Sequence, residues 1–270
     1  MTIAFDRLSG NETPCGSQQP CGGKAPSGYE LSSGPEPQSI DLNADLGEGC
    51  PSDESLLERI SSASVCCGAH AGDVASIRQT LRLAALRGVV VGAHPGYPDR
   101  AHFGRRERNI RPEEVENLIL DQTETLRQLA EAVDSSVRFL KPHGALYNQA
   151  QRQEAVAEGV LAAAQRLSLP LLGQPGTMLE RLAASRGVRF VPEGFPDRRY
   201  RDDGLLVPRE EPGVVVDDPA EIDAQVVRLV RERRVLTLCI HGDAPSAVAS
   251  AEGVRQVLTR HQIAMRSFLS

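Results

Sequence analysis

The sequence predicts an α/β protein that folds as a distorted, TIM-like (β/α) barrel of about seven parallel strands. Short apolar runs that end in Gly with His or Asp alternate with amphipathic helical stretches, and this alternation predicts parallel strands covered by helices. Runs such as VVVGA and VLTLCI are apolar throughout, which is typical of strands buried on both faces. Seven such units without a glycine-rich phosphate fingerprint favour a barrel, and an open doubly wound sheet is the alternative.

The expected elements follow one another from residue 39 to the end of the chain. Strand-containing runs, each with the turn that follows it, are expected at 39–49, 62–73, 88–99, 136–148, 169–177, 188–200 and 235–247. Apolar residues with helical spacing predict helices over 74–88, 111–133, 154–167, 178–187, 219–234 and 251–263. We therefore expect residues 39–270 to form a single catalytic β/α barrel domain.

Residues 1–38 have a different composition from the rest of the chain. They are rich in Gly, Ser, Pro and Gln and have no apolar period, which predicts a disordered N-terminal extension. This segment has no signal-peptide pattern, and no apolar run approaches the ~20 residues of a membrane helix. The six cysteines form no spaced framework, so free thiols in a reducing cytoplasm are expected.

The charge balance indicates which partners to expect. The net charge is −6 and the pI about 5.6, so there is no electrostatic case for nucleic acid or an anionic membrane. The expected partner is a small molecule.

Polar side chains gather along or just after the predicted strands. In a β/α barrel the carboxyl ends of the strands open onto one face, where active sites form. A single histidine is more often a satisfied core residue, but four at equivalent strand ends predict a site. His102 and His261 lie elsewhere and are interpreted as structural. The strand-end residues are Asp41, Asn43, Asp45, Glu48, His70, Asp73, His94, Tyr97, Asp99, Lys141, His143, Tyr147, Asn148, Glu193, Asp197, Arg198, Tyr200, His241 and Asp243.

One strand-end residue differs in type from nearly all other cations of the chain. Of the 30 lysines and arginines, only Lys24 and Lys141 are lysines, and Lys24 lies in the extension. Lysine is a point charge whose pKa burial can lower, whereas arginine stays charged. We therefore expect Lys141, in the stretch KPHGALYN, to have a chemical role.

Aspartate and histidine at strand ends also suit a divalent metal ion. Asp45, His70 and His94 form one candidate ligand set, with His241 or Asp243 as a further ligand. No HxH or HExxH spacing supports such a site, so the sequence leaves the metal open.

Six motifs, taken in order, resemble the LamB/YcsF lactam-utilisation family, which includes the A subunit of ATP-dependent 5-oxoprolinase. They are DLNADLGEG, CGAHAGD, GAHPGYPDR, KPHGALYN, the FPDRRY region with DGLLVPR, and CIHGD, and the resemblance extends from residue 39 to about residue 268. The second motif has Ala69 where the family usually has phenylalanine, the segment before the seventh strand looks short, and the extension lies outside the pattern.

The resemblance implies ATP-dependent opening of 5-oxo-L-proline to L-glutamate, together with companion subunits B and C. It implies ATP, with Mg²⁺, as the cofactor. No GxxxxGK[ST] phosphate loop occurs in the sequence, so the ATP site is expected on an unrecognised surface or on a companion subunit.

Roles for the strand-end residues follow from this implied reaction. Lys141 is expected to bind the activated oxygen or phosphoryl group, and Arg198 the substrate carboxylate. Asp45 or His70 is the expected base, and Asp73 and Asp243 are expected to orient imidazoles. The remaining catalytic candidates are His94, His143 and His241, and the remaining substrate-binding candidates are Asn43, Glu48, Tyr97, Tyr147 and Asn148.

Two other functions stay open at this point. One is a metal-dependent amidohydrolase or deacetylase-like barrel that acts alone, without ATP. The other is a non-catalytic subunit that only binds the lactam for a partner.

Overall fold

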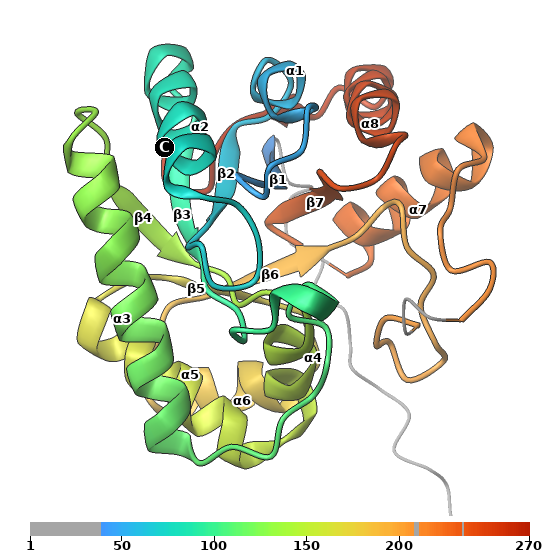
Figure 1. The fold of residues 1–270 in the computed structure, drawn as a ribbon. Helices are drawn as coiled ribbons and strands as arrows, with labels where there is room; N and C mark the ends of the chain where they lie inside the picture. Colours follow the sequence, from blue (N-terminus) through green and yellow to red (C-terminus); the bar gives the residue numbers. More distant parts are fainter. Residues whose placement is uncertain (1–38, 208–210, 234) are drawn as a thin grey trace, which may run out of the picture. The chain divides into compact units, whose positions relative to one another are not determined.

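Parallel strand pairing organises the part of the chain that the structure describes (Figure 1). The structure is a computed structural model that describes residues 39–207, 211–233 and 235–270. The expectation of a disordered segment over residues 1–38 lies outside the described residues.

Strands and helices alternate along the described chain. The strands are β1 (Ser39–Leu46), β2 (Ser62–Cys66), β3 (Val90–His94), β4 (Val137–Leu140), β5 (Leu171–Gly173), β6 (Phe190–Gly194), β7 (Thr237–His241) and β8 (Ala264–Met265). The helices are α1 (Asp53–Leu57), α2 (Val74–Arg87), the short 3₁₀ helix η1 (Arg100–His102), α3 (Pro112–Glu131), α4 (Gly144–Arg152), α5 (Glu154–Leu167), α6 (Met178–Ser185), α7 (Pro219–Arg231) and α8 (Ala247–Arg260).

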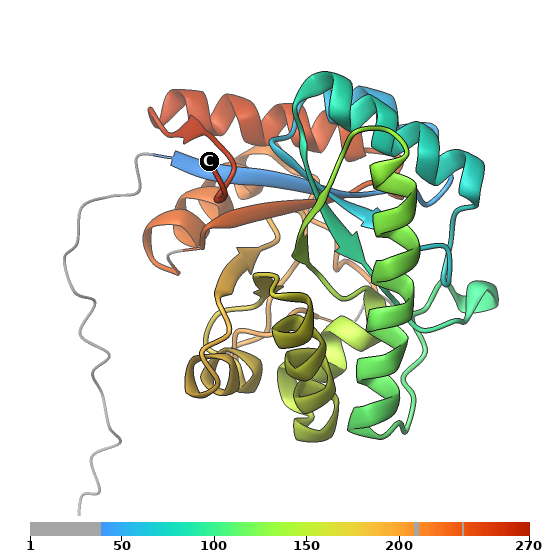
Figure 2. The same ribbon diagram turned by 90° about the vertical axis from the view of Figure 1, so that its left-hand side faces the viewer.

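Seven parallel strands of the described chain close into a barrel, which confirms the predicted fold class. The order runs from β2 through β7 to β1, and β1 also pairs with β2. Figure 2 shows the helices on the outside of the strands. Closure of the barrel means that the carboxyl ends of all seven strands surround one opening.

The barrel is distorted between β3 and β5. The β3–β4 register shifts between Val91 and Ala93, and β4 pairs with β5 only through Leu140 and Leu171. A Cβ on Gly92 would lie 2.2 Å from the Phe139 ring. Glycine is therefore required where this ring packs against β3.

The sequence of β1 explains how the barrel holds both an apolar shell and a polar interior. Leu42, Ala44 and Leu46 alternate with Asp41, Asn43 and Asp45 along the strand, and alternate residues point to opposite faces. The leucines and Ala44 belong to the large apolar core, whereas the polar residues contact polar side chains of other strands.

Local signals in the sequence fix several helix ends. Asp73 caps α2 by accepting a hydrogen bond from Ser76 N, and Gly88 ends that helix in the left-handed conformation. Asp218 caps α7 in the same way, directly before Pro219. These caps fix the residues at which α2 and α7 begin.

Four elements were not expected from the sequence, and one of them is the short η1 (Arg100–His102). Helix α1 has only five residues, and β8 adds two residues beside the start of β1. Helix α4 begins at Gly144, inside the run that we expected to follow the fourth strand as a turn. The strand itself ends at Leu140, because Pro142 has no N–H to continue the ladder.

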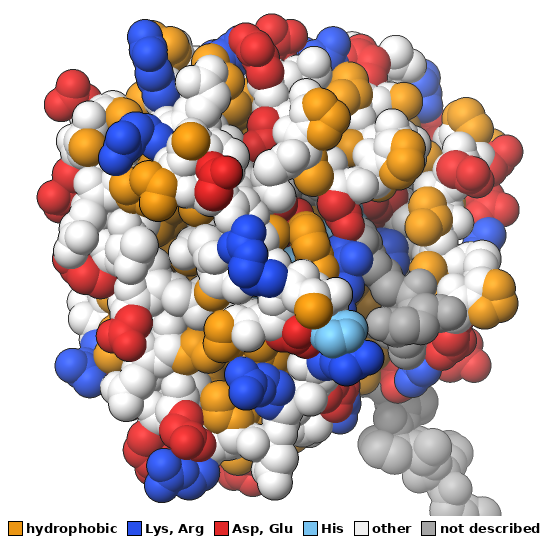
Figure 3. Space-filling model, viewed as in Figure 1, with side chains coloured by type: hydrophobic (Ala, Val, Ile, Leu, Met, Phe, Trp, Pro, Cys, Tyr) orange, Lys and Arg blue, Asp and Glu red, His pale blue; other side chains and the backbone are white. Residues whose placement is uncertain are grey.

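The surface carries no large area of one charge on the face shown in Figure 3, where acidic, basic and hydrophobic side chains are interspersed. None of the helices in the described residues has the length and apolar character needed to cross a membrane.

Candidate functional site

A cavity of about 300 Å³ opens at the carboxyl ends of the strands. This volume is at the small end of the range for small-molecule sites, ~300–1,000 Å³. Its wall contains residues at or just after the ends of β1, β3, β4, β6 and β7, as the predicted convergence of strand ends requires. The strand-end candidates that line it are Asp45, His94, Lys141, His143, Tyr147, Asn148, Arg198 and His241.

The stretch KPHGALYN forms the turn from β4 into α4. The backbone N–H groups of Lys141 and His143 donate to the carbonyls of Ala93 and Pro95, 2.9 and 2.8 Å away. These bonds hold the stretch beside the end of β3. Gly144 has φ +55°, and a Cβ there would lie 2.8 Å from a backbone oxygen, so the turn requires glycine.

Lys141 is buried, and its ammonium group is surrounded by acceptors from other strands. Its Nζ atom lies 2.8 Å from Oδ1 of Asp45 and 2.9 Å from Oε1 of Glu193. It also lies 2.9 Å from Sγ of Cys239 and 3.3 Å from Oδ1 of Asn43. An ammonium has three protons, so contacts within the chain can engage all of them.

The charge state of Lys141 differs from the one that burial alone would give. Burial lowers the pKa of this group, but Asp45, Cys239 and Glu193 outweigh it and raise the pKa well above its ordinary value. Lys141 is therefore protonated at neutral pH. The structure has a fixed cation there, held by carboxylates.

Asp45 is the acidic partner that reaches the cavity. Burial raises its pKa, but the charges of His94 and Lys141 outweigh burial and hold the pKa well below its ordinary value. One oxygen accepts from Lys141, and the other, Oδ2, lies 3.6 Å from Nε2 of His94. Asp45 is therefore an ionised carboxylate at the cavity wall.

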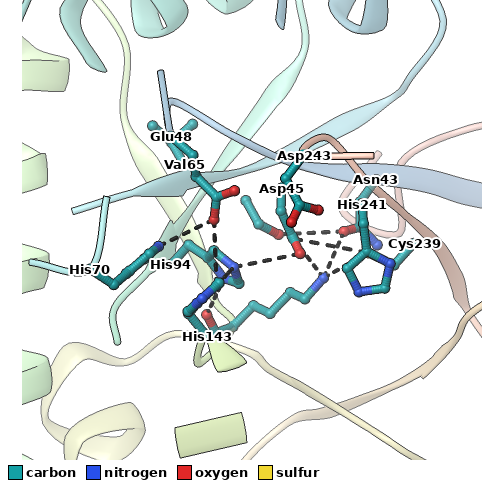
Figure 4. Close-up of polar contacts among 12 residues, drawn as sticks. Asn43, Asp45, Glu48, Val65, His70, His94, His143, Cys239, His241 and Asp243 are labelled. Atoms are coloured by element: carbon teal, nitrogen blue, oxygen red, sulfur yellow. Dashed lines mark hydrogen bonds and ion pairs between the residues drawn. The ribbon is translucent and has the colours of Figure 1, made fainter. Parts of the chain in front are cut away.

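Three histidines and one glutamate form a buried cluster next to Asp45 (Figure 4). Nε2 of His94 lies 2.9 Å from Nδ1 of His143. Oε1 of Glu48 lies 3.2 Å from Nε2 of His70 and 3.4 Å from Nδ1 of His143. The rings of His70 and His143 are stacked, with centroids 3.8 Å apart.

Burial sets the charge of this cluster. It lowers the pKa of His94 to about 4 and that of His70 to about 3, and it lowers the pKa of His143 well below the ordinary range. Burial, with the charges of Asp45 and Asp243, raises the pKa of Glu48 well above its ordinary value. The imidazoles are thus neutral at neutral pH.

His241 lies on the other side of the cavity from this cluster. Its Nδ1 atom lies 3.2 Å from Oδ2 of Asp197, and its ring stacks on Phe195 with centroids 5.4 Å apart. The carboxylate and the aromatic ring together fix the orientation of the imidazole.

Several other predicted residues have different surroundings from those expected. Asp73 is exposed and caps α2. It therefore caps a helix, whereas we expected it to orient an imidazole. Tyr97 is fully buried and donates to Oε1 of Gln149, outside the cavity wall. Asp243 pairs with Arg105, at 2.5 Å.

Below the cavity, polar side chains fill the interior of the barrel. Asn43 Nδ2 donates to Oε1 of Glu193 and to Oγ1 of Thr237, at 3.0 and 2.7 Å. Thr237 in turn donates to Oδ2 of Asp41. Asn43 therefore supports Lys141 from below and does not line the cavity.

Four residues near the site received no role from the sequence. Glu193 and Cys239 contact the ammonium of Lys141, and Arg105 and Phe195 line the cavity. From the sequence we placed Glu193 among the strand-end residues, because it is a carboxylate on a largely apolar strand, but gave it no role. Cys239 stands two residues before His241, so strand alternation places both on one face.

Two groups of side chains could hold a metal ion in the described residues. One comprises Glu48, His70, His94 and His143, and the other Asp45, Cys239 and His241. The sequence placed Asp45 with His70 and His94 in one set. The structure instead adds Glu48 and His143 to the two histidines and groups Asp45 with His241.

Comparisons with known proteins agree with the resemblance seen in the motifs. The model of the LamB/YcsF family matches residues 40–270. The chain belongs to the LamB/YcsF family.

Three LamB/YcsF relatives show how far this similarity extends. Two proteins, from Methylococcus capsulatus and Neisseria meningitidis, carry the name of the A subunit of 5-oxoprolinase. Each is 42% identical to this chain. The Methylococcus protein matches 84% of this chain and 94% of its own length, and the Neisseria protein matches 82% of this chain and 96% of its own length. The crystal structure of a lactam utilization protein from Thermus thermophilus is 37% identical and has a TM-score of 0.77. It covers 85% of this chain and all of its own.

Proposed function

We propose that this chain is the A subunit of a 5-oxoprolinase, which opens the lactam of 5-oxo-L-proline to give L-glutamate with cleavage of ATP. The observation that carries this proposal is the set of family motifs whose polar residues surround one cavity. The relatives are named as the A subunit of 5-oxoprolinase, which supports 5-oxo-L-proline as the substrate. The small volume of the cavity suits a five-membered ring.

The reaction defines the groups that the cavity must supply. Water forms a bond to the carbonyl carbon, the carbon–nitrogen bond breaks, and the ring nitrogen takes up a proton. An unactivated amide resists water, so transfer of the terminal phosphoryl group of ATP to the amide oxygen, with release of ADP, would activate the carbon before water adds. When the carbon–nitrogen bond then breaks, an acyl phosphate remains, and a second water hydrolyses it to glutamate and inorganic phosphate. The site needs a base, an acid and cations.

Asp45 is the best candidate for the base. It is ionised, reaches the cavity and is held in place by Lys141. His241 lines the cavity with one ring nitrogen held by Asp197, so it is the candidate that passes a proton to the ring nitrogen of the lactam. Arg198 lines the cavity and is the candidate for the substrate carboxylate.

Lys141 takes a different role from the one first expected. Because its protons are engaged by Asp45, Glu193 and neighbouring atoms, it serves mainly as a positioning residue that keeps Asp45 charged. An incoming anionic oxygen would bind it only by displacing one of these acceptors.

ATP and the partner subunits also belong to the proposal. The relatives are named as one lettered subunit, the A subunit, and this supports a complex with further subunits, which we take to be B and C. The sequence has no phosphate loop of the GxxxxGK[ST] type, so we place the ATP·Mg²⁺ site on one of these companions.

The test is release of glutamate from 5-oxo-L-proline by the purified full chain, with and without ATP and with and without the companion subunits. The proposal expects release only when ATP and the companions are present. Release by this chain alone without ATP would instead support a metal-dependent hydrolase, an alternative that the buried histidine cluster favours. Lactam binding with turnover that is indifferent to Asp45 would support a non-catalytic subunit.

A further inference from the structure

The hydrogen bonds of two buried histidines determine which of their ring nitrogens carry protons. Nδ1 of His94 lies 2.8 Å from the carbonyl oxygen of Lys141, and Nε2 of His143 lies 2.9 Å from the carbonyl oxygen of Phe103. A carbonyl can only accept, so each of these nitrogens must be the N–H donor. The other nitrogen of each neutral ring therefore carries a lone pair.

These two lone-pair nitrogens face one another. Nε2 of His94 and Nδ1 of His143 are 2.9 Å apart, and the two side chains are 1% and 5% exposed. Two acceptors at this distance repel each other unless a cation lies between or beside them. That cation is either a shared proton or a metal ion.

The surrounding atoms favour a metal ion. Oε1 of Glu48 lies 3.4 Å from Nδ1 of His143. Tetrahedral zinc with ligands at 2.0–2.1 Å separates its ligand atoms by about 3.3 Å, close to these spacings. The backbone carbonyls that fix the far nitrogens of the two histidines are the outer contacts that metal-binding histidines commonly have.

His70 fits an outer role in this arrangement. Its Nε2 lies 3.2 Å from the same Oε1 of Glu48, while its ring is parallel to that of His143, at an interplanar angle of 2°. The lone pairs of two stacked rings lie in separate parallel planes, so one ion cannot lie in the plane of both. His70 is therefore placed to orient Glu48, and not to bind the ion itself.

We propose that His94 Nε2, His143 Nδ1 and Glu48 Oε1 bind one divalent metal ion of the zinc class. Two imidazoles and one carboxylate form a donor set that suits zinc with a further position left open. His94 and His143 line the cavity, so the open position faces it. When bound there, such an ion would act as a Lewis acid next to Asp45, and this chemical role rests on the proposed function.

The second group of candidate ligands supports the choice of the first. Asp45, Cys239 and His241 also lie close together, but the ammonium of Lys141 is 2.8 Å from Asp45 and 2.9 Å from Cys239. A divalent ion in that position would have to displace a buried charge of the same sign. Among the described residues, the ammonium of Lys141 thus lies beside the group of Asp45, Cys239 and His241. In the group of Glu48 and the histidines, two lone pairs face each other and can bind a metal ion.

The test uses full-length protein that has been treated with a chelator and then titrated with Zn²⁺ by calorimetry. A parallel titration uses Co²⁺, whose visible absorption reports the coordination geometry. The proposal expects one equivalent of Zn²⁺ and a tetrahedral or five-coordinate Co²⁺ spectrum. Glu48→Gln and His94→Gln should each weaken Zn²⁺ binding by more than ~100-fold, since loss of an outer contact alone costs ~10–100-fold.

His102→Gln is the matched control, because His102 pairs with Asp99 on the surface and lies outside the cluster. It should bind Zn²⁺ as the wild type does. Circular dichroism of each variant checks folding, and Glu48→Gln, with almost unchanged shape, keeps the test valid if His94→Gln unfolds. Absence of stoichiometric Zn²⁺ and Co²⁺ binding, or equal binding by wild type and Glu48→Gln, would overturn the proposal in favour of a shared proton.

Assays of glutamate release distinguish the proposed metal site from the proposed function. Full glutamate release by chelator-treated, metal-free protein would contradict the metal site and leave the 5-oxoprolinase proposal intact. Stoichiometric Zn²⁺ binding that requires Glu48 and His94, without any glutamate release, would support the metal site and contradict the proposed function.

Discussion

The ammonium of Lys141 and the carboxylate of Asp45 form a buried ion pair, with Nζ 2.8 Å from Oδ1. The two side chains are 3% and 9% exposed. They come from the ends of β4 and β1, so the pair links strands that are not neighbours in the barrel. It explains why a point charge, and not a planar guanidinium, stands at position 141.

Removal of the ammonium should destabilise the protein strongly. Lys141→Met leaves Asp45 and Glu193 buried without their cation, and loss of one partner of a buried pair costs about 3–5 kcal/mol. Denaturation in urea should show this loss in the free energy of unfolding. Arg166→Met is the control, because it removes a more exposed ion pair with Glu116. It should change the free energy of unfolding little.

A double-mutant cycle tests the pairing itself. The combination of Lys141→Met with Asp45→Asn should cost less than the sum of the two single variants, because each single change leaves an uncompensated charge. Simple additivity of the two losses would contradict a direct ion pair.

Asp41 should make the stability of the barrel depend on pH. Burial raises the pKa of this carboxyl to about 6, against an ordinary value of 3.8, although Thr237 and two serines donate to it. Between these values the folded chain binds more protons than the unfolded chain, so its contribution to stability is present below pH 3.8 and is lost as the pH rises through 6.

Asp41→Asn isolates this contribution. At pH 7 the variant lacks the cost of the buried charge, which amounts to about 3 kcal/mol for two pKa units. Relative to wild type, the variant should therefore gain stability as the pH increases from 4 to 7. Urea denaturation at each pH measures the difference, and a difference that is constant over this range would contradict the assignment.

Two buried tyrosines provide a matched pair of variants. The hydroxyl of Tyr97 donates to Gln149 at 2.8 Å, so Tyr97→Phe should cost about 1 kcal/mol of stability and leave activity unchanged. Tyr147 lines the cavity, and its buried hydroxyl lies next to the carboxyl group of Glu193, without a hydrogen bond of ordinary geometry in the described residues. Tyr147→Phe should therefore cost little stability.

The effect of Tyr147→Phe should appear in substrate binding instead. If its hydroxyl bonds the lactam, the KM for 5-oxo-L-proline should rise about 2–10-fold, the equivalent of one ordinary hydrogen bond. Steady-state kinetics of both variants make the comparison. A KM that increases for Tyr97→Phe and not for Tyr147→Phe would reverse the roles of the two hydroxyls.

The alternation in DLNADL accounts for the positions of the polar residues of β1, because a strand has a period of two. Helix α5 has the bounds that apolar spacing predicted, 154–167. Strand alternation and helix bounds depend on residues that are close together in the sequence, so they can be predicted from a single sequence.

Contacts across the barrel could not be derived in this way. The partner of Lys141 on β6 is Glu193, and that pairing depends on barrel closure. The raised pKa of Lys141 follows from the same contacts, so composition alone could not predict it. Helix α4 was missed because its first residues, 144–148, belong to the stretch KPHGALYN, which we interpreted as the turn after the fourth strand.

The central claim is that ionised Asp45 acts as the base of the cavity, and glutamate release by Asp45→Asn tests it most directly. Asp73→Asn, which changes an aspartate at a helix cap outside the cavity, is the control. With ATP and the companion subunits present, we expect Asp45→Asn to lower kcat at least ~100-fold, the usual contribution of a general base, while Asp73→Asn stays near wild type. An Asp45→Asn variant that folds and turns over at the wild-type rate would contradict the claim.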